Sequence, residues 1–400
     1  MAGMAGVREF DFIVIGAGIA GASAGYELAA PAHGKERPGG RAGGRAGGRP
    51  GGRVALLERE DQPGYHATGR SAAFYIQSYG NAVVRALTVG SWEFFTGPPE
   101  GFTDGPLLTE RGALFVGRPD QIGELDDLIA ETRPLAPHLE RLDAAAARAL
   151  VPILRPSALG GAVLDSKAME IDVNRLHQGY LRGLKARGGE VVTRAEVRGL
   201  RPGPAGWLVE TKAGDFAAPV VVNAGGAWCD EIAGLAGAEP VGLEPKRRTV
   251  ITFDAPPGLD TRDWPLTTGV AEDFYFKPDS GRLMGSPADE TPMPPCDVQP
   301  DEFDIAVAVD RIQTATTLEI RRIGNTWAGL RTFAPDKTMV AGFDPAREGF
   351  FWLAGQGGYG IQTAPAMGRL TAALATGAPM PEDLAALGVT AEAVSPARFA

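Results

Sequence analysis

The stretch DFIVIGAGIAGASAGYELAA, residues 11–30, decides the fold class of this chain. Its first five residues form a short apolar, β-branched run, which is typical of a fully buried parallel strand. Gly16, Gly18 and Gly21 follow at G-x-G-x-x-G spacing, and a helical stretch with small residues on one side comes next. Glycines at this spacing allow a tight turn, and they let backbone N–H groups and a helix N-terminus approach a pyrophosphate. The motif alone also fits an ordinary glycine turn, but a strand before it and a helix after it favour a dinucleotide-binding unit.

The second strand of this unit ends in an acidic residue, Glu58, which closes the run RVALLE. In dinucleotide-binding folds such a residue lies about 20 residues beyond the glycines and holds the ribose hydroxyls. Glu58 lies 37 residues after Gly21, which leaves roughly 17 residues more than that spacing needs. The surplus matches a glycine–arginine repeat, so we interpret residues of about 35–53 as a flexible, disordered insertion between helix and strand. A solvated loop without function is favoured over RNA contact by its arginines.

Length and composition predict a protein of two domains. The chain has 400 residues, 44% hydrophobic and 22% charged, as in ordinary globular proteins. The net charge is −10, and because residues 35–53 contribute +5, the rest of the chain carries −15. Such an acidic body argues against nucleic acid or an anionic membrane as partner.

Cysteines and histidines indicate neither disulfides nor a metal site. Cys229 and Cys296 are far apart, and His33, His66, His138 and His177 lack metal-ligand spacing. No apolar run is long enough to span a bilayer, and the first residues lack the apolar core of a signal peptide. We therefore expect a cytoplasmic protein with no metal and no integral membrane segment.

Several further motifs identify a family. REDQPGYHATGRSAAFYIQSYG follows Glu58, a segment for which a nicotinamide dehydrogenase has no need; later come VVNAGGAWCDEIAGLAG, PKRR, FYFKPD, TWAGLR and GQGGYGIQT. With these motifs the chain resembles the FAD-dependent D-amino-acid oxidase/dehydrogenase (DAO) family, and within it the bacterial D-arginine dehydrogenases. The resemblance covers nearly the whole chain outside residues 35–53.

Two glycine-rich turns between strand and helix support this resemblance. The second turn follows the apolar run GFFWLAG and precedes the helical stretch APAMGRLTAALATG. A helix N-terminus there offers N–H groups to negative charge, and the resemblance implies that it stabilises the anionic reduced flavin. The resemblance implies non-covalent FAD, since Cys229 shows no sign of a covalent bond. The cofactor-binding residues that it implies are Gly16, Gly18, Ile19, Ala20, Gly21, Glu58, Arg59, Thr68, Arg70, Ser71, Ala72, Ala73, Val197, Ala224, Gly225, Trp228, Gly355, Gly357, Gly358, Tyr359, Gly360, Ile361 and Gln362.

The expected architecture is α/β, with a Rossmann-like FAD-binding domain interleaved with a mixed, largely antiparallel β substrate domain. We assign residues 8–107, 172–237 and 330–400 to the first domain, and residues 108–171 and 238–329 to the second. The second set contains alternating runs such as RRTVITF and TTLEIRR, which read as antiparallel strands. Residues 119–150 look helical, with Ile122, Leu125, Leu128 and Ile129 on one stripe.

Arginine is the residue type that recognises a carboxylate with a planar, forked donor. By resemblance, Arg331 pairs with the amino-acid carboxylate, Tyr275 adds a hydroxyl, and the Gly358 carbonyl accepts from the amine. Arg248 and Tyr79 match further active-site positions of the D-arginine dehydrogenases. A surface ion pair is the alternative for each arginine, strongest for Arg247, and the two tyrosines rest mainly on the resemblance.

Two departures from the D-arginine dehydrogenases concern the substrate side chain. Phe74 stands where they have a histidine, and an ungapped reading puts Ala113 where a carboxylate faces the distal cation of their substrate. Glu110 is nearby and could substitute if the loop shifts. We expect a preference shifted towards neutral or hydrophobic D-amino acids.

The expected reaction is oxidative deamination of D-amino acids to 2-oxo acids and ammonia, by hydride transfer from Cα to flavin N5 and with a further electron acceptor. One alternative keeps FAD but changes the substrate to a secondary amino acid or a 2-hydroxy acid. Another is a protein that recruits RNA or a partner through the arginine–glycine tract.

Overall fold

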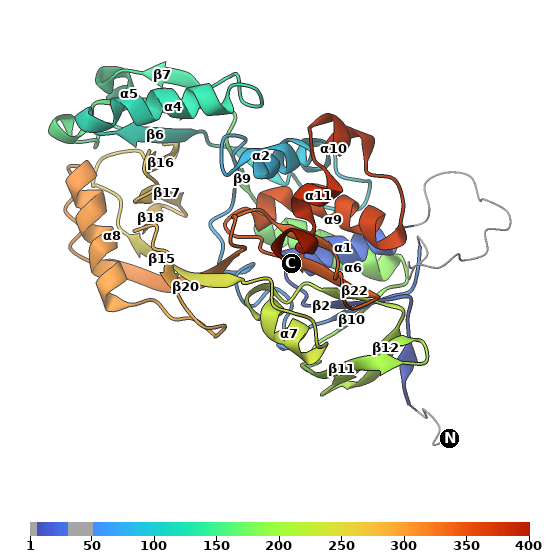
Figure 1. The fold of residues 1–400 in the computed structure, drawn as a ribbon. Helices are drawn as coiled ribbons and strands as arrows, with labels where there is room; N and C mark the ends of the chain where they lie inside the picture. Colours follow the sequence, from blue (N-terminus) through green and yellow to red (C-terminus); the bar gives the residue numbers. More distant parts are fainter. Residues whose placement is uncertain (1–5, 31–50) are drawn as a thin grey trace.

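The structure, a computed structural model, describes residues 6–30 and 51–400 (Figure 1). The proposed insertion therefore lies almost entirely outside the described residues, as does His33.

A six-stranded sheet forms the centre of one half of the molecule, and β2 (Phe12–Ile15), from the opening motif, lies inside it. All strand pairs of this sheet are parallel except that of β21 with β22. The strand order is β10 (Glu190–Val192), β3 (Val54–Leu57), β2, β14 (Val220–Asn223), β22 (Phe350–Ala354) and β21 (Val340–Phe343).

Both faces of this sheet are covered, which explains why its strands are apolar without alternation. Phe12 and Val14 pack into a core shared with helices, whereas Ile13 and Ile15 pack into a second core. The helices on the first face are α1 (Ile19–Leu28), α6 (Val173–Ala186) and α9 (Gly360–Thr376). The second face is covered by α7 (Cys229–Leu235) and by a sheet of β1 (Arg8–Glu9), β13 (Gly214–Ala218), β12 (Gly206–Thr211) and β11 (Val197–Gly203).

A nine-stranded sheet with a separate core forms the other half, at the left of Figure 1. Its pairs are antiparallel except for β16 with β6, so the predicted mixed, largely antiparallel sheet is confirmed. The strands are β19 (Thr291–Pro292), β15 (Glu244–Phe253), β18 (Arg282–Ser286), β17 (Tyr275–Asp279), β16 (Leu266–Gly269), β6 (Ala113–Gly117), β8 (Gly161–Asp165), β7 (Glu140–Leu142) and β20 (Ile323–Phe333), which pairs with β15. The helices of this half are α4 (Ile122–Thr132), α5 (Ala144–Leu150) and α8 (Glu302–Ala315).

Smaller elements complete the chain. A three-stranded sheet joins β4 (Phe74–Tyr75), β9 (Met169–Ile171) and β5 (Leu108–Glu110). The remaining α-helices are α2 (Ala82–Val89), α3 (Trp92–Thr96), α10 (Glu382–Ala386) and α11 (Ala391–Val394). Within residues 6–30 and 51–400, no helix is both long and apolar enough to cross a membrane.

The two central sheets draw their strands from alternating stretches of the chain, in the order that the sequence suggests. β20 runs without interruption through the boundary at residues 329/330, from Ile323 to Phe333. The interleaved division at those residue numbers stays a proposal.

Two local expectations need correction. TTLEIRR forms no strand: after α8 these residues make a single bridge, Thr316 to Leu154, and β20 begins only at Ile323. The alternation comes from an extended connection that buries Leu318 against the core of the nine-stranded sheet without a partner strand. Residues 119–150 are not one helix, because β7 separates α4 from α5.

Candidate active site

A cavity of about 490 Å³ is lined by segments from Ile15 to Gln362 and brings both glycine turns together. At its first turn, Gly16 has φ of +99°, and a Cβ there would lie 2.4 Å from the Ala224 carbonyl oxygen. A Cβ on Gly21 would lie 1.9 Å from the Gly16 carbonyl oxygen. These two positions therefore exclude any side chain, and α1 begins directly at the cavity.

Glu58 is held beside this turn by backbone amides. Its carboxylate accepts hydrogen bonds from Ala17 N at 3.1 Å and Glu60 N at 3.0 Å. The residue is only 7% exposed, and burial raises the pKa of its carboxyl group against the effect of these hydrogen bonds. On the far side of the turn, His177 Nε2 lies 2.8 Å from the Ala17 carbonyl oxygen, and burial lowers the pKa of its imidazole. A neutral imidazole that donates to this carbonyl fits both observations.

The segment 59–73 lines the cavity next to Glu58 with Arg59 and with residues 64–68 and 70–73. Thr68 Oγ1 accepts from Ile19 N at 3.0 Å, which fixes the segment to the start of α1. The Arg59 guanidinium lies 4.8 Å from the ring centre of Trp228, and the His66 ring lies 4.7 Å from the same ring. Arg59, His66 and Trp228 thus form a polarisable wall at this part of the cavity.

Arg70 uses its side chain within the protein. Its Nη1 donates to the carbonyl oxygens of Val298 at 3.0 Å and Ala328 at 3.1 Å, and Nη2 pairs with Asp297. In return Trp327 Nε1 donates to the Arg70 carbonyl at 3.1 Å. Arg70 thus fastens the segment 68–73 to the nine-stranded sheet, although it also lines the cavity.

The second glycine turn lies between β22 and α9. Gly357 N donates to the Thr332 carbonyl at 2.8 Å, which joins the turn to the end of β20. The helix begins at Gly360, five residues before Pro365, so it starts earlier than the stretch APAMG suggests. Both polar side-chain atoms of Gln356 are buried without a hydrogen-bond partner among the described residues, although this residue lines the cavity.

Arg248 and Arg331 face the same part of the cavity from adjacent strands. In the register of β15 and β20, Arg248 lies opposite Gly329 and Arg331 lies opposite Lys246, so all these positions share one face. Arg247, which precedes Arg248 in β15, instead pairs with Asp304 of α8. The remaining wall is largely apolar and consists of Phe74, Ile76, Phe115, Val250, Leu266, Thr268, Tyr275, Ala288 and Leu330.

Arg331 has one hydrogen-bond partner among the described side chains: its Nη1 donates to Tyr79 Oη at 3.2 Å. Burial alone would lower the pKa of Arg331, but nearby Tyr79, Tyr275 and Glu272 leave that pKa raised. A Cβ on Gly358 would lie 2.8 Å from Arg331 Nη1 and 3.0 Å from Tyr79 Oη. The second glycine turn is therefore in van der Waals range of the two groups that could hold a carboxylate.

Glu272, in the loop between β16 and β17, is a cavity residue that the sequence motifs did not indicate. Its φ of +53° is left-handed, which is uncommon for glutamate and often found at functional sites. The residue is exposed on the cavity side, but the protein around it partly desolvates the carboxyl group and raises its pKa, while Arg331 and Arg248 act in the opposite direction. No hydrogen bond or ion pair of its side chain is found within the described part of the chain, and the carboxyl is open to the cavity.

Neither of the positions considered for the missing carboxylate serves. Ala113 is fully buried in β6, and Glu110 is exposed on β5; both lie outside the cavity lining. Phe74 does line the cavity. Cys229 is fully buried outside the lining, and burial raises the pKa of its thiol, whereas Cys296 lies in the cavity wall.

Nearly all the residues predicted for the site meet in this one cavity. The exceptions are Gly21, which packs against Gly16, and Tyr359, whose ring lies against Tyr79 with 4.9 Å between centroids. Residues that the motifs missed include Leu57, Ala195, Glu196, Ala288 and Cys296. Leu57 ends β3 directly before Glu58, so its place beside that residue could have marked it, whereas the other four come from connections without recognisable motifs.

The chemistry of the cavity fits a flavin dinucleotide. Two helix N-termini, of α1 and α9, reach it, and each suits negative charge. Glu58 offers acceptors for ribose hydroxyls, and the unpaired amide of Gln356 can both donate and accept, as the polar edge of a flavin ring requires.

Known proteins agree with this assignment. The family "FAD dependent oxidoreductase" (DAO) matches residues 11–374. Glycine oxidase from Geobacillus kaustophilus (strain HTA426) is 25% identical over 403 residues, 96% of this chain and 97% of that protein. FAD-dependent oxidoreductase domain-containing protein 1 from Bos taurus is 31% identical over 171 residues, 38% of this chain and 35% of that protein, so this chain matches about a third of its length.

Solved structures show the same fold. The crystal structure of glycine oxidase from Geobacillus kaustophilus has a TM-score of 0.77 at 21% identity, covering 96% of this chain and 99% of that one. The crystal structure of L-proline dehydrogenase from P. horikoshii has a TM-score of 0.77 at 20% identity, covering 98% of each chain. With the family match over most of its length, the chain belongs to the DAO family of FAD-dependent oxidoreductases.

Proposed function

We propose that this FAD-dependent oxidoreductase oxidises D-amino acids to imino acids, which hydrolyse in water to 2-oxo acids and ammonia. The observation that carries the proposal is Arg331, which faces the cavity and has only Tyr79 Oη as a hydrogen-bond partner among the described residues. A guanidinium with a free edge binds a carboxylate through two parallel hydrogen bonds. The D configuration rests on the resemblance of the sequence motifs.

The groups around Arg331 would orient the rest of the substrate. Tyr79 Oη accepts from Arg331, so its own O–H remains able to donate to the bound carboxylate. Gly358 lies directly beside Arg331 and Tyr79, and its carbonyl is proposed to accept from the amine. Tyr275 lines the same region and adds a second hydroxyl.

The cavity also favours the reactive form of the substrate. The positive charges of Arg331 and Arg248 lower the pKa of a nearby ammonium group, which favours the neutral amine. Phe74, Ile76 and Leu266 present apolar surface and exclude water from the reacting centre. FAD, when bound, supplies the two-electron acceptor for the Cα–H bond. Residues beside Glu58 and both glycine turns would hold it.

The visible spectrum of the FAD-loaded protein tests this function. Under anaerobic conditions we expect D-amino acids, and not their L enantiomers, to bleach the flavin absorbance. The same panel contains a secondary amino acid and a 2-hydroxy acid, and bleaching by one of these alone would transfer the proposal to that substrate class. Readmission of oxygen, or of an artificial acceptor, then reveals which compound takes the electrons. Failure of every compound in the panel to reduce the flavin would refute the proposal.

A further inference from the structure

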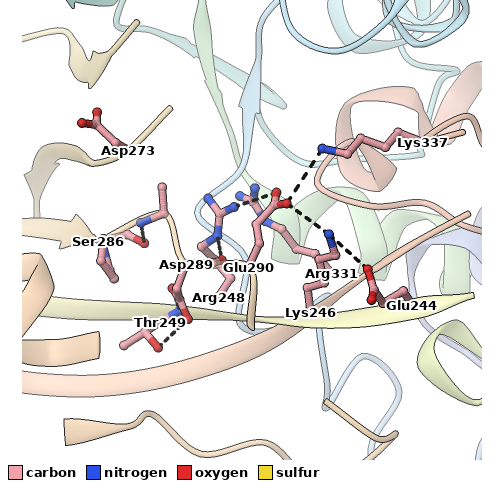
Figure 2. Close-up of polar contacts among 12 residues, drawn as sticks. Glu244, Lys246, Arg248, Thr249, Asp273, Ser286, Asp289, Glu290, Arg331 and Lys337 are labelled. Carbon is pink, nitrogen blue, oxygen red and sulfur yellow. Dashed lines mark hydrogen bonds and ion pairs between the residues drawn. The ribbon is translucent and has the colours of Figure 1, made fainter. Parts of the chain in front are cut away.

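A short segment, residues 286–290, lies at the substrate end of the cavity and binds the side chain of Arg248. We call this segment the strap. Arg248 Nε donates to the Asp289 carbonyl at 2.9 Å, and Nη2 lies 3.4 Å from Glu290 Oε1. Figure 2 shows the Glu290 carboxylate between the Arg248 guanidinium and the amino groups of two lysines. Ala288 of the strap lines the cavity itself.

The backbone of the strap is anchored without the help of the Glu290 side chain. The Asp289 carboxylate accepts from Thr249 N at 2.6 Å and from Thr249 Oγ1 at 3.0 Å. Ala288 N donates to Ser286 Oγ at 3.1 Å, and Ala288 has a left-handed φ of +51°. Ala288 has a strained backbone, and hydrogen bonds hold both it and the neighbouring Asp289, which indicates a conformation that the surroundings impose. A substitution at Glu290 should therefore leave the strap in place.

Arg248 needs a negative partner to stay where it is. It is 7% exposed, and burial together with the nearby Arg331 lowers the pKa of its guanidinium. Two guanidinium groups on one face of a buried sheet repel each other, and a buried charge without a partner is costly. Glu290 is the only carboxylate within ion-pair distance of Arg248 among the described residues.

The strap also determines which edge of Arg248 is available. Nε and Nη2 are both engaged by residues of the strap, so Nη1 is the nitrogen left for a ligand in the cavity. In Arg331 the engaged nitrogen is Nη1, which donates to Tyr79, so Nε and Nη2 are left for a ligand. One carboxylate between the two arginines can thus receive a paired contact from Arg331 and a single contact from Arg248.

We infer that Glu290 is a positioning residue: it holds Arg248 beside Arg331 so that both can bind the carboxylate of the substrate. The inference rests on the proposed function in that a carboxylate is the ligand. Glu290 itself does not line the cavity. Lys246, at 3.4 Å, and Lys337, at 3.9 Å, balance the charge of Glu290, which limits its repulsion of the incoming anion.

Calorimetric titration of the FAD-loaded protein with 4-methylpentanoate, a carboxylate without an amine, tests this inference. Glu290→Ala should weaken binding about tenfold or more, because Arg248 loses its charged partner. Glu290→Gln keeps the shape and an acceptor oxygen, so it should also weaken binding, though less. With D-leucine as substrate, KM should rise more than kcat falls in both variants.

Glu244→Gln is the matched control, since Glu244 pairs with the same Lys246 at 3.1 Å but forms no contact with Arg248. Its affinity for the carboxylate should stay within about twofold of the wild type. Unchanged or tighter binding in both Glu290 variants would overturn the inference, as would a wild-type protein that does not bind the carboxylate. Because this titration needs no turnover, its result is independent of whether D-amino acids reduce the flavin.

Discussion

At the scale of single residues, Glu58 shows how one side chain is prepared for a ligand. Its carboxylate is buried, and backbone amides on two sides fix its direction. Glu58→Ala should raise the dissociation constant for FAD about tenfold or more, because hydrogen bonds from ribose hydroxyls to a charged acceptor are lost. Quenching of flavin fluorescence on titration of the apoprotein measures this. Glu210→Gln, in an exposed pair with Arg201, should bind FAD normally, and equal affinity in both variants would remove Glu58 from the site.

Arg331 is the residue on which the proposed function depends most. Arg331→Lys keeps the charge but loses the planar fork, so kcat/KM for D-amino acids should fall by about 10²-fold. Steady-state rates on the FAD-loaded variant measure the loss. The control is Arg282→Lys, which changes an arginine of the same sheet that pairs with Asp254 at an exposed position. A variant that keeps its activity would show that the carboxylate binds elsewhere.

Glu272 should make the protein less stable as the pH rises. The surrounding protein partly desolvates its carboxyl group and raises its pKa above the ordinary value of 4.5. Because the residue is exposed on the cavity side, the effect is small, and the folded protein binds this proton slightly more tightly than the unfolded chain does. The contribution to stability is then fully present below the unfolded pKa and is lost as the pH rises through the folded pKa. Glu272→Gln should therefore have a higher Tm than the wild type above neutral pH and no advantage at about pH 4.

Thermal melts of the apoprotein across this pH range test the stability effect. Glu319→Gln, a change at an exposed position paired with Arg321, is the control and should follow the wild type at every pH. A gain in Tm that is the same at both ends of the range would show that ionisation of Glu272 is not the cause.

Site residues that belong to a sequence motif of fixed spacing could be predicted from the sequence. Site residues that only tertiary packing brings to the cavity could not. The glycines and Glu58 sit at a spacing that a pyrophosphate and a ribose dictate, so the sequence alone indicates them. Glu272 and Glu290 belong to connections between strands of the nine-stranded sheet, where no spacing rule applies. Their proximity to Arg248 and Arg331 depends on the order of strands in that sheet.

At the scale of elements, a methyl group added at Gly358, in the turn between β22 and α9, should disturb substrate binding and not folding. This glycine does not have a left-handed backbone, so Gly358→Ala is not excluded by strain. Its new Cβ would instead lie 2.8 Å from Arg331 Nη1 and 3.0 Å from Tyr79 Oη. We expect a folded, FAD-loaded protein whose KM for D-amino acids rises about tenfold or more, as carboxylate contacts of this kind are lost.

Steady-state kinetics and the flavin content of the purified variant separate these effects. Gly234→Ala is the control, because a Cβ there meets nothing within 4 Å, and it should match the wild type. Loss of FAD from Gly358→Ala, with the KM of the remaining holoprotein unchanged, would contradict the assigned position of this turn.

Elements with a complete local signal were predictable. DFIVI became β2, buried on both faces, because a continuous β-branched run fits only the inside of a covered sheet. TTLEIRR instead alternates between apolar and polar residues, and apart from the bridge of Thr316 to Leu154 it has no partner strand. Alternation indicates burial on one side, not pairing. The start of α9 was misjudged because proline usually marks a first turn, whereas here residues 360–364 before Pro365 are already helical.

At the scale of the whole molecule, the region between α1 and β3 should be dispensable for catalysis. The cavity is lined by the N-terminal end of α1 and the C-terminal end of β3, through Ile19 and Leu57. The other ends of these elements, Leu28 and Val54, lie outside its lining. Deletion of residues 36–52 should therefore leave FAD content and turnover within about twofold of the full chain, as expected for an insertion in a surface loop. Loss of flavin or of activity in the deletion protein would contradict this.

The two-domain plan was predictable from alternating stretches of different pattern, but the way the two halves meet was not. β20 begins in the nine-stranded sheet and ends next to the turn that precedes α9. No local pattern in TWAGLRTF distinguishes a strand that stops at a boundary from one that crosses it. The cavity draws on both halves because the chain passes between them repeatedly, and β20 is one of these passages.

The hydrogen bond from Gly357 N to the Thr332 carbonyl holds the second glycine turn at a fixed place beside the end of β20. Thr332 follows the proposed carboxylate anchor, and Gly357 precedes the proposed amine acceptor, so the span between anchor and acceptor cannot stretch. When the carboxylate of a substrate is bound to Arg331, only an amine on the adjacent carbon lies at the right distance from the Gly358 carbonyl. Amino acids with one more methylene between the two groups should be refused, whatever side chain they carry.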